Sequence, residues 1–420
     1  MNEVTPAEAG ERLLDGIPRQ PGSPPEAEPA ARPPGPVRLA ARAFAVFTGR
    51  VLGPYQAATV RIGFGLVWMV YLLREWPNRR LLYGDTSPWS TELAERLLAD
   101  NGALTVLPWF GGRLWFELVY HLAVLAALAV LLGWRTRAST VLFLVTVLSL
   151  QNRNVFLGDG GDNVVHLMAV YLVFTRCAEV WSLDARRAGS GRTGVALWAV
   201  LGAVLLVCGL GGFSGESLAW TTATFPYVGW GPVFWALWAV AGLWWLAGRL
   251  APDGETRAVL DALATMVHNC AMLVIAVEVV LIYATAGWYK VQGSRWQDGT
   301  ALYYPLHLDY FTPWPGLSGL VGSALLPVFL ITYGTVLLQV AFPFTLVSRR
   351  VKNTLLVVMM AEHVGIAVLL GLPVFSLAMI AADAVFLPTA ALRWAGRRVG
   401  RTVRRVGRVP GGEKGATPLS

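Results

Sequence analysis

The sequence predicts an all-α protein, a polytopic membrane helix bundle with about eight to ten transmembrane helices. Its residues are 55% hydrophobic and only 14% charged, and its mean hydropathy is +0.52, which is too apolar for an ordinary soluble globule. The 18 tryptophans and 12 tyrosines suit the two membrane–water interfaces. The net charge of +8 comes from arginines gathered at the ends of apolar segments, so we attribute it to membrane orientation and expect no nucleic-acid partner.

Ten apolar segments support this fold, because each approaches the ~20 residues that cross ~30 Å of hydrocarbon. They cover residues 57–76, 113–132, 137–151, 163–181, 193–211, 229–248, 263–287, 320–347, 353–371 and 374–391. The third segment is short, and the fifth and sixth have the weakest signal. We also expect an amphipathic helix near residues 91–100.

The two ends of the chain differ from the apolar middle. Residues 1–50 are predicted to form a disordered, proline-rich cytoplasmic tail, because PRQPGSPPEAEPAARPPGP has mixed charge and no hydrophobic periodicity. No cleavable signal peptide is expected before it. Residues 51–392 form the predicted transmembrane domain, and residues 393–420 form a basic cytoplasmic tail.

The arginines give the segments a consistent orientation, with both termini in the cytoplasm of a cell membrane that the chain crosses several times. Cations follow alternate segments, at Arg135, Arg137, Arg186, Arg187, Arg249, Arg257, Arg349, Arg350 and Lys352. The opposite loop at 212–228 has none, whereas loop 77–112 is an exception. Loops 77–112 and 288–319 then lie outside, where we expect them to cover a cavity.

Lys290 stands in YATAGWYKVQGSRWQDG, Tyr283–Gly299, at the edge of a long apolar run. The chain has only three lysines, and Lys352 and Lys414 lie in basic margins. An arginine keeps its proton, whereas a lysine in a partly dry site can become a neutral amine and act as a base. The alternative is a lysine that reaches the interface from a helix end.

Asp162 and His166 lie four residues apart, and therefore on one helical face. A carboxylate in this position can fix the tautomer and orientation of an imidazole that takes part in catalysis. The alternative is that Asp162 caps the start of the helix and His166 is a satisfied core residue.

Other ionisable groups stand inside apolar segments, where each needs a partner or a function. Glu117 and His121 repeat the same spacing. Glu362 and His363 are adjacent and so point ~100° apart, which prevents both from facing one cavity fully. Hydrogen bonds between helices are the alternative for both pairs, and an ion pair is the alternative for Asp383.

Three further polar residues and the cysteines are given no catalytic role. Arg61 is expected to reach the interface as an anchor. His268 and His307 are interpreted as incidental. The three cysteines lack CxxC spacing, so no metal site is expected. Nor does the sequence contain a GxSxG, HExxH or P-loop motif.

Several of these segments resemble the vitamin K-dependent γ-carboxylase superfamily, specifically its bacterial horizontally transferred transmembrane (HTTM) domain branch. The similar stretches are AGWYKVQGSRWQDG at 286–299, DNVVHLMAVYLVF at 162–174, WSLDARR at 181–187 and EHVGIAVLLGLPVFSLAMIAADAVF at 362–386. They occur in the family's order and span roughly residues 57–391. Residues 193–250 look like an insertion of two extra helices between the WSLDARR stretch and the helix that carries Lys290.

The resemblance implies a chemistry for these residues. In that family a lysine deprotonates a reduced naphthoquinone, whose oxygenation yields a strong base that abstracts a proton from the substrate. We therefore expect reduced menaquinone or vitamin K hydroquinone as cofactor. The resemblance implies Lys290 as the base and His166 as its helper, and His363 falls at a family histidine. With Asp162 to orient His166, the expected catalytic residues are Lys290, His166 and Asp162, and the expected quinone contacts are His363, His121, Trp288 and Trp296.

We expect a lysine-base enzyme that acts with a membrane naphthoquinone on an unidentified substrate. The chain ends in a basic tail instead of the large luminal domain with which the animal carboxylase binds its propeptide, so carboxylation of a protein partner is not implied. An alternative is a non-enzymatic factor for maturation or export of a secreted peptide, as resemblance to a sporulation-delaying toxin maturation protein suggests. A transporter is disfavoured because no inverted repeat with broken helices is visible.

Overall fold

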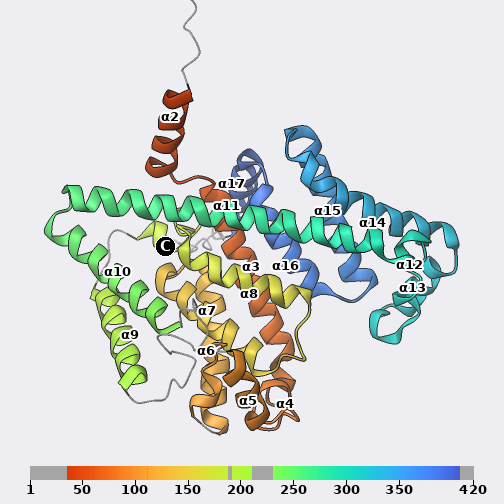
Figure 1. Cartoon of the computed structure of the whole chain (residues 1–420), viewed down its shortest axis with the longest axis horizontal. Coiled ribbons are helices and arrows are strands. Elements are labelled where there is room, and N and C mark those ends of the chain that lie inside the picture. Colours follow the sequence, from red (N-terminus) through yellow and green to blue (C-terminus); the bar gives the residue numbers. More distant parts are fainter. Residues whose placement is uncertain (1–35, 102, 111, 188–191, 211–229, 407–420) are drawn as a thin grey trace, which may run out of the picture. The chain divides into compact units, whose positions relative to one another are not determined.

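The computed structural model describes residues 36–101, 103–110, 112–187, 192–210 and 230–406 of the chain. Every regular element in these residues is helical, which confirms the predicted all-α fold (Figure 1). The chain forms two units, Met1–Ala45 and Val46–Ser420. Helix α2, Pro36–Gly49, occupies part of the tail that we predicted to be disordered. The rest of that prediction, for residues 1–35, lies outside the described residues.

All ten predicted apolar segments overlap helices of the second unit, but α8 ends at Phe174, before the predicted end at 181, and the predicted segment 374–391 is broken between α16 and α17. The amphipathic helix expected near 91–100 is also confirmed. The helices are α3 (Pro54–Glu75), α4 (Arg79–Tyr83), α5 (Thr91–Asn101), α6 (Arg113–Leu132), α7 (Thr136–Arg153), α8 (Gly160–Phe174), α9 (Arg192–Leu210), α10 (Trp230–Leu250), α11 (Glu255–Gln292), α12 (Ser294–Gln297), α13 (Pro315–Gly322), α14 (Leu325–Thr345), α15 (Arg349–Leu369), α16 (Pro373–Asp383) and α17 (Thr389–Val406).

Six helical stretches in the described residues are long and apolar enough to cross a membrane. They are α3 with α4, α6, α10, α11, α14 and α15, and a seventh is possible if α16 and α17 form one bent span. This number is below the predicted eight to ten. Helices α8 and α9 are apolar but shorter, and threonines, serines, glutamine and arginines interrupt α7. The arrangement is compatible with a multi-pass protein in a lipid bilayer.

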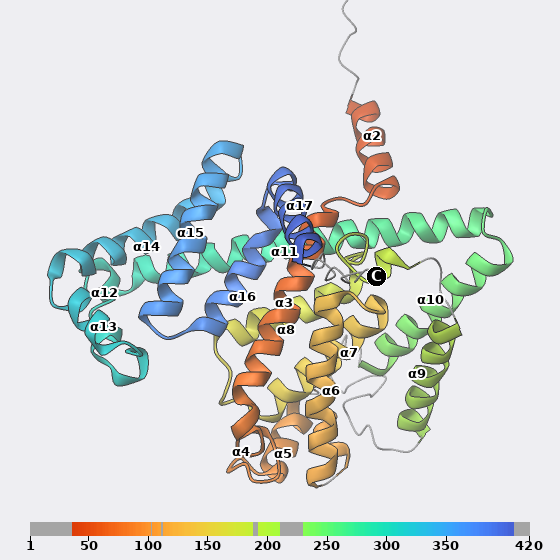
Figure 2. The same cartoon turned by 180° about the vertical axis from the view of Figure 1, so that it is seen from behind.

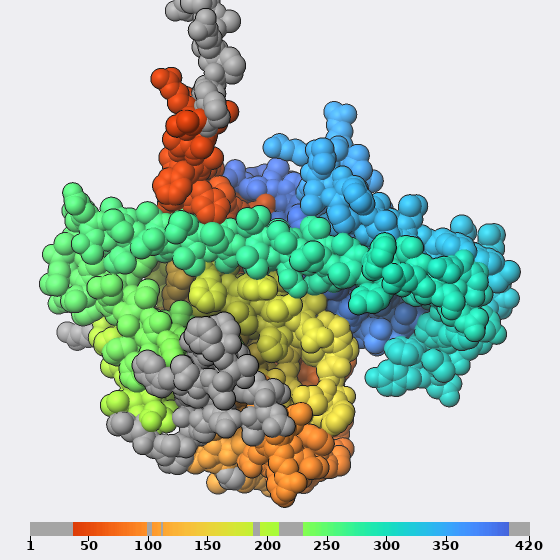
Figure 3. Space-filling view, in the orientation of Figure 1, coloured from red at the N-terminus to blue at the C-terminus, as the bar shows by residue number. Residues whose placement is uncertain are grey.

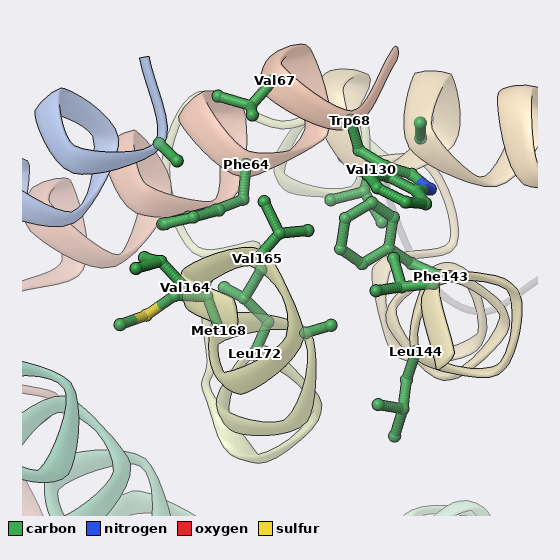
Figure 4. Packing of buried hydrophobic residues seen from close by; sticks show 14 of the residues in the cluster. Phe64, Val67, Trp68, Val130, Phe143, Leu144, Val164, Val165, Met168 and Leu172 are labelled. Atoms are coloured by element: carbon green, nitrogen blue, oxygen red, sulfur yellow. The ribbon is translucent and has the colours of Figure 1, made fainter. Parts of the chain in front are cut away.

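The apolar core lies where α3, α6, α7 and α8 pack together (Figure 4). Phe64 and Trp68 of α3, Phe143 of α7, and Val165 and Met168 of α8 are all fully buried there. These large side chains come from three helices and fill the space between them. Their burial holds these helices in a fixed arrangement, on which the rest of the bundle can pack.

Arg61 on α3 is fully buried beside this core. Its guanidinium donates hydrogen bonds to the carbonyl oxygens of Cys177 (3.1 Å), Leu131 (2.9 Å) and Trp181 (2.7 Å), and also to that of Val130. The prediction that Arg61 reaches the membrane interface is therefore wrong. Its charge instead satisfies carbonyls at the end of α6, which a helix terminus leaves without partners.

Helix α11 is ~57 Å long at 1.5 Å per residue, and it runs across the ends of several other helices (Figures 1 and 2). It forms a continuous ridge on the face seen in Figure 3. Buried His268 fixes its first half, because Nδ1 accepts from the Arg176 amide (2.9 Å) and Nε2 donates to the Leu52 carbonyl (2.9 Å). Asn269 accepts from the Leu52 amide as well (2.9 Å). The structure thus gives His268, which we interpreted as incidental, a positioning role.

Helices α9 and α10, within the stretch that we read as an insertion, form a pair. The rings of Trp198 and Trp238 stack with centroids 4.3 Å apart. Each indole nitrogen donates to the carbonyl of the other tryptophan at 3.0 Å. A Cβ atom at Gly202 or Gly242 would lie less than 3.0 Å from the facing indole. The two glycines therefore allow the two helices to approach closely.

Candidate functional site

Lys290 lies in the last turn of α11, which packs mainly against α14, and α14 in turn packs against α15. Its Nζ donates a hydrogen bond of 2.8 Å to Oε1 of Gln339 on α14. The same nitrogen lies 5.1 Å from the centroid of the Trp296 ring. No carboxylate of the described residues forms an ion pair with it within 4.0 Å. The amine is thus held by a neutral amide and an aromatic face.

The turn after α11 brings Trp296 under Lys290. Gly293 ends the helix with an extended backbone, and its amide donates to the carbonyls of Tyr289 and Lys290, both at 3.1 Å. The Trp296 amide then donates to the Gly293 carbonyl at 3.0 Å, which starts α12. The chain therefore reverses direction within three residues and carries the indole back to the lysine.

The Asp298–Gly299 pair fixes this turn against α14. The Asp298 carboxylate accepts hydrogen bonds from the Thr300 amide (2.9 Å) and the Thr300 hydroxyl (2.5 Å). The hydroxyl bond is the main cause that lowers the pKa of Asp298 below its ordinary value. Gly299 has φ +77°, and a Cβ atom there would lie 2.0 Å from the Phe329 ring. Only glycine permits this conformation at this close approach.

Lys290 lies deeper in the bundle than we predicted. Its partner Gln339 is well inside α14, so about fourteen residues of that helix, or ~21 Å, continue beyond the level of the lysine. The chain after α11 packs along this extension, where the Tyr333 hydroxyl donates to the Gln297 carbonyl at 2.7 Å. The lysine marks the end of α11 but not the end of the apolar bundle.

Gln339 connects Lys290 to a carboxylate. Its amide nitrogen donates to Oε1 of Glu362 on α15 at 3.4 Å, while its amide oxygen accepts from Lys290. The other carboxylate oxygen of Glu362, Oε2, is buried and has no hydrogen bond within 3.5 Å among the described residues, and the Thr335 hydroxyl of α14 is a further polar neighbour of this carboxylate. Gln339 is itself 6% exposed. A neutral amide thus separates the cation from the anion.

His363 belongs to a second hydrogen-bonded group. The Tyr283 hydroxyl of α11 lies 2.9 Å from Nε2 of His363 and donates to Oδ2 of Asp383 on α16 at 3.0 Å. When Asp383 is ionised, the Tyr283 hydroxyl uses its hydrogen to bond to the Asp383 carboxylate. The contact with His363 must then be a hydrogen bond from Nε2–H to the phenolic oxygen, so Nδ1 of the neutral ring carries no proton. His363 Nδ1 and Asp383 Oδ1 are buried and have no partner in the described part of the chain.

The two groups meet through adjacent residues of α15. Glu362 points to Gln339 on α14, whereas His363 points to Tyr283 on α11. This difference confirms the prediction that adjacent helical positions face different neighbours. The ion pair considered for Asp383 is replaced by its hydrogen bond to Tyr283.

Tyr283 and Gln339 have contacts in these groups but were not predicted as site residues. Gln339 is the one strongly polar side chain in the apolar run VLLQVAF. This isolation was a usable signal, because a polar side chain inside a membrane helix requires a partner. Tyr283 gives a weaker signal, since tyrosine also suits an interface.

Asp162 and His166 do not form the predicted pair. Asp159 caps α8, and Oδ2 of Asp162 accepts from the Asp159 amide at 2.9 Å, which completes a capping box. The His166 ring contacts Gln151 instead, with 3.1 Å between Nδ1 and Oε1. The alternative interpretation of Asp162 as a helix cap is confirmed only in part, because Asp159 is the N-cap and Asp162 is its N3 partner in the capping box. Gln151 is the residue that orients the imidazole.

Phe375 lies between the first turn of α8 and His363. The Phe375 ring lies 5.7 Å from the His363 ring. A Cβ atom at Gly161, in the first turn of α8, would lie 2.7 Å from the Phe375 Cα. The first turn of α8 therefore packs near His363, but no hydrogen bond among the described residues joins His166 to Lys290 or His363.

Two of the predicted quinone contacts lie apart from these groups. His121 is nearly half exposed, and its Nδ1 lies 2.6 Å from the Glu117 carbonyl oxygen. Its ring meets the edge of Trp76 with centroids 4.7 Å apart, and no described contact links it to Lys290. Trp288 is 62% exposed. Of the predicted quinone contacts, the structure brings Trp296 and His363 to the polar groups described above.

Two cavities lie outside this region. One of ~270 Å³ is lined at the ends of α7 and α8 by residues such as Thr136, Arg137 and Cys177. An open one of ~450 Å³ lies between Trp314 and Val368. In the described residues, no group of three or more histidine, cysteine, aspartate or glutamate side chains has a metal-binding arrangement.

We name the polar groups from Lys290 to Asp383 the α11–α16 cluster: Lys290, Gln339, Glu362, His363, Tyr283 and Asp383. It combines an amine, an imidazole, a phenol and two carboxylates in an apolar bundle, which is the composition of a proton-transfer site. Comparison with family models, with curated proteins and with solved structures finds no significant match to this chain.

Proposed function

We propose that the α11–α16 cluster is an intramembrane acid–base site in which Lys290 is the base. The observation that carries this proposal is the pairing of Lys290 Nζ with the neutral Gln339 amide, without an ion pair in the described residues. A lysine held by a carboxylate would lose that attraction on giving up its proton. A lysine held by an amide loses no ion pair, so its neutral form is accessible.

Three buried acceptor atoms indicate what kind of ligand the site would take. Glu362 Oε2, His363 Nδ1 and Asp383 Oδ1 all lack a partner in the described residues. A buried acceptor without a hydrogen bond costs about 1 to 3 kcal/mol. A ligand that donates hydroxyl hydrogens would remove part of this cost, whereas a ligand with acceptors alone would not.

A reduced naphthoquinone fits these requirements. It is lipid-soluble and aromatic, and it carries two hydroxyl donors. One of its hydroxyls would be accepted by Glu362, on the side of α15 that faces Gln339, or by His363 and Asp383 on the side that faces Tyr283. Its ring would meet the aromatic faces of Trp296 and Phe375. When bound, this group would supply an acidic hydroxyl and two reducing electrons. The resemblance to the HTTM branch of the γ-carboxylase superfamily supports the same choice.

Each residue of the cluster has a distinct task in this proposal. Lys290 Nζ takes the proton, and Gln339 keeps that nitrogen in place. Glu362 receives a hydrogen bond from the other end of the same amide, so it stabilises the charged amine at a distance without fixing it as an ion pair. Tyr283 and Asp383 hold the His363 ring in one orientation.

The location of the protein is part of the proposal. The arginine pattern supports a cell membrane with both chain termini in the cytoplasm. The substrate is expected to be a lipid-soluble molecule that reaches the cluster from the bilayer, or a secreted peptide.

The test uses the full chain in lipid nanodiscs supplied with a reduced naphthoquinone. We expect oxygen uptake and loss of the quinol, and we expect Lys290→Met and Lys290→Arg each to lower the rate by about 100-fold or more. Lys352→Arg is the matched control, because Lys352 donates only to the Phe386 carbonyl and is expected to keep the parent rate. A rate unchanged in Lys290→Arg would contradict the role of Lys290 as a base.

A measurement of binding separates the enzyme from the maturation factor. Quinol that copurifies with the protein and is lost in His363→Ala supports the site even if turnover is absent. Equal quinol content in the parent protein, in His363→Ala and in Glu362→Gln would contradict quinol binding at this cluster.

A further inference from the structure

The C-terminal helix α17 has an exposed cationic surface. It contains no acidic residue, and four of its arginines, Arg393, Arg397, Arg398 and Arg401, are exposed. Its axis turns by 116° from the preceding helix, so it does not continue the direction of α16. Helix α16 is only 11 residues or ~16 Å long. The turn therefore sends α17 away from the axis of that apolar helix.

The start of α17 is fixed on the bundle. Gln56 on α3 donates to the Thr389 hydroxyl (3.0 Å) and to the carbonyl of Leu387 just before the helix (2.8 Å). A Cβ atom at Gly396 would lie 2.5 Å from the Trp181 ring, so the helix backbone rests directly on that indole. These contacts determine which way the first two turns of α17 face.

Beyond this docked part, apolar side chains of α17 are uncovered. Leu392 packs on the bundle and is 6% exposed, whereas Val399, two turns later, is 64% exposed. Trp394 is 51% exposed, and the Arg398 guanidinium lies 4.5 Å from its ring centroid. An exposed tryptophan beside arginines on an amphipathic helix is typical of a helix that lies in a membrane interface.

The surrounding end of the bundle is also basic. Lys352 of α15 donates to the Phe386 carbonyl, which places the start of α15 beside the chain that leads into α17. The exposed Arg349 and Arg350 belong to that same start. Neither α17 nor the first turn of α15 contains an acidic residue that would neutralise these charges.

We propose that α17 binds the surface of an anionic phospholipid leaflet. Arg397, Arg398 and Arg401 contact the phosphates, and Trp394, which lies on the same side of the helix as these arginines, inserts at the level of the headgroups. A membrane is a better occupant than a nucleic acid, because apolar spans begin immediately beside α17 and because the helix also exposes apolar side chains. Each arginine near an anionic leaflet strengthens such binding roughly 5-fold.

The test places a spin label on α17 in the full chain. Thr402 is exposed, and Thr402→Cys is labelled after Cys208→Ser and Cys270→Ser, while Cys177 is buried. The protein is reconstituted in nanodiscs of phosphatidylcholine with or without 30% phosphatidylglycerol. Power saturation then reports whether the label is accessible to a water-soluble or to a lipid-soluble relaxation agent.

We expect the label to lie at headgroup depth in the anionic nanodiscs and to become more exposed to water in the neutral ones. The triple variant Arg397→Gln, Arg398→Gln, Arg401→Gln is expected to weaken the membrane-bound state by roughly 100-fold in total. The matched control removes three exposed arginines from elsewhere in the bundle, Arg74→Gln, Arg96→Gln and Arg113→Gln, and is expected to behave as the parent.

Two results would overturn the proposal. One is equal accessibility of the label in both bilayers in the correctly folded parent. The other is arginine-dependent binding of a labelled oligonucleotide to the detergent-solubilised protein without any response to lipid, which would assign the surface to nucleic acid.

Discussion

Arg61 and the α11–α16 cluster are two ways of burying charge in one bundle. The Arg61 guanidinium is fully buried and donates to four carbonyl oxygens. In the cluster, three equally buried acceptors of Glu362, His363 and Asp383 have no partner among the described residues. Burial removes polar groups from water in both regions, which costs free energy. Around Arg61 the hydrogen bonds within the protein offset this cost, whereas the three open acceptors of the cluster leave part of it uncompensated.

The difference separates a structural role from a functional one. A buried group whose hydrogen bonds are all formed holds its neighbours in place. Buried acceptors without partners lower the stability of the fold, and a ligand that donates hydrogen bonds to them would remove this penalty on binding. Three substitutions and one titration test this difference between satisfied and unsatisfied buried groups.

Arg61→Met should have the largest effect on stability. It removes the guanidinium donors from the Val130 and Leu131 carbonyls at the end of α6 and from the Cys177 and Trp181 carbonyls, and we expect a loss of about 3 to 5 kcal/mol in the free energy of unfolding. Steric trapping in bicelles measures this quantity. Arg74→Met is the control on the same helix, since its side chain is 52% exposed and it should change stability by less than about 0.5 kcal/mol. Equal stability of the two variants would remove the structural role of Arg61.

Gly133→Ala tests how tightly the Arg61 site is built. Gly133 has φ +64°, and a Cβ atom there would lie 2.4 Å from Ser182 Cβ and 2.9 Å from the Arg61 guanidinium. We expect a loss of about 3 kcal/mol, from backbone strain together with overlap. Gly53→Ala isolates the backbone part, because Gly53 has nearly the same left-handed backbone, φ +61° and ψ +43°, and the added Cβ would meet only Gln56 atoms at 3.4 Å or more. If both variants lose the same stability in the unfolding assay, overlap at Gly133 contributes nothing.

Asp383→Asn should have a much smaller effect on folding than on function. The amide keeps an acceptor for Tyr283 and removes a buried carboxylate, so we expect stability to stay within about 1 kcal/mol of the parent. Quinol oxidation should nevertheless fall at least tenfold. Ser376→Ala is the control on the same helix, because this buried hydroxyl also lacks a hydrogen-bond partner in the described residues, and it should leave the rate unchanged. A loss above about 3 kcal/mol in Asp383→Asn would mean that the cluster is structural, like Arg61.

The pH response of Asp298 should be the smallest effect. Hydrogen bonds from Thr300 hold the pKa of this exposed carboxylate below its ordinary 3.8. Because the folded pKa is the lower one, the stabilisation of the turn is complete above pH ~4 and is lost as the pH falls through the folded value. The Thr300 amide resonance in threonine-labelled protein reports this titration. A midpoint at or above the ordinary value would contradict these hydrogen bonds.

The fold was predictable because hydropathy in a long apolar segment determines that it is helical. The contacts of the polar residues were less predictable. Arg61 was interpreted from its depth alone, but depth does not show whether carbonyls of another helix lie within reach. The role of Asp162 could have been predicted from the sequence, because Asp159 and Asp162 are three residues apart, which is the spacing of a capping box. The i, i+4 rule identifies residues on one face and does not decide which of several partners they choose.

The cluster shows the same limit. Lys290 and His363 were found from their own chemistry, because titratable groups in apolar segments are uncommon. Gln339 and Tyr283 were missed as site residues because their importance depends on which helices meet. The depth of Lys290 was misjudged for a related reason: the end of α11 is visible in the sequence, but the ~21 Å of α14 beyond it depends on the register between the two helices.

The tryptophan pair between α9 and α10 has a consequence for assembly. Trp198 and Trp238 occupy the same position in two similar heptapeptides, ALWAVLG and ALWAVAG, which are forty residues apart by subtraction. The indole N–H of each tryptophan donates to the backbone carbonyl of the other. In such a reciprocal contact, as in an isologous interface, the two tryptophans use the same groups for each other. Neither indole N–H is left free to bond to a third helix of the same kind. The two copies of this heptapeptide motif therefore form a closed helical hairpin instead of the start of an extendable helical array.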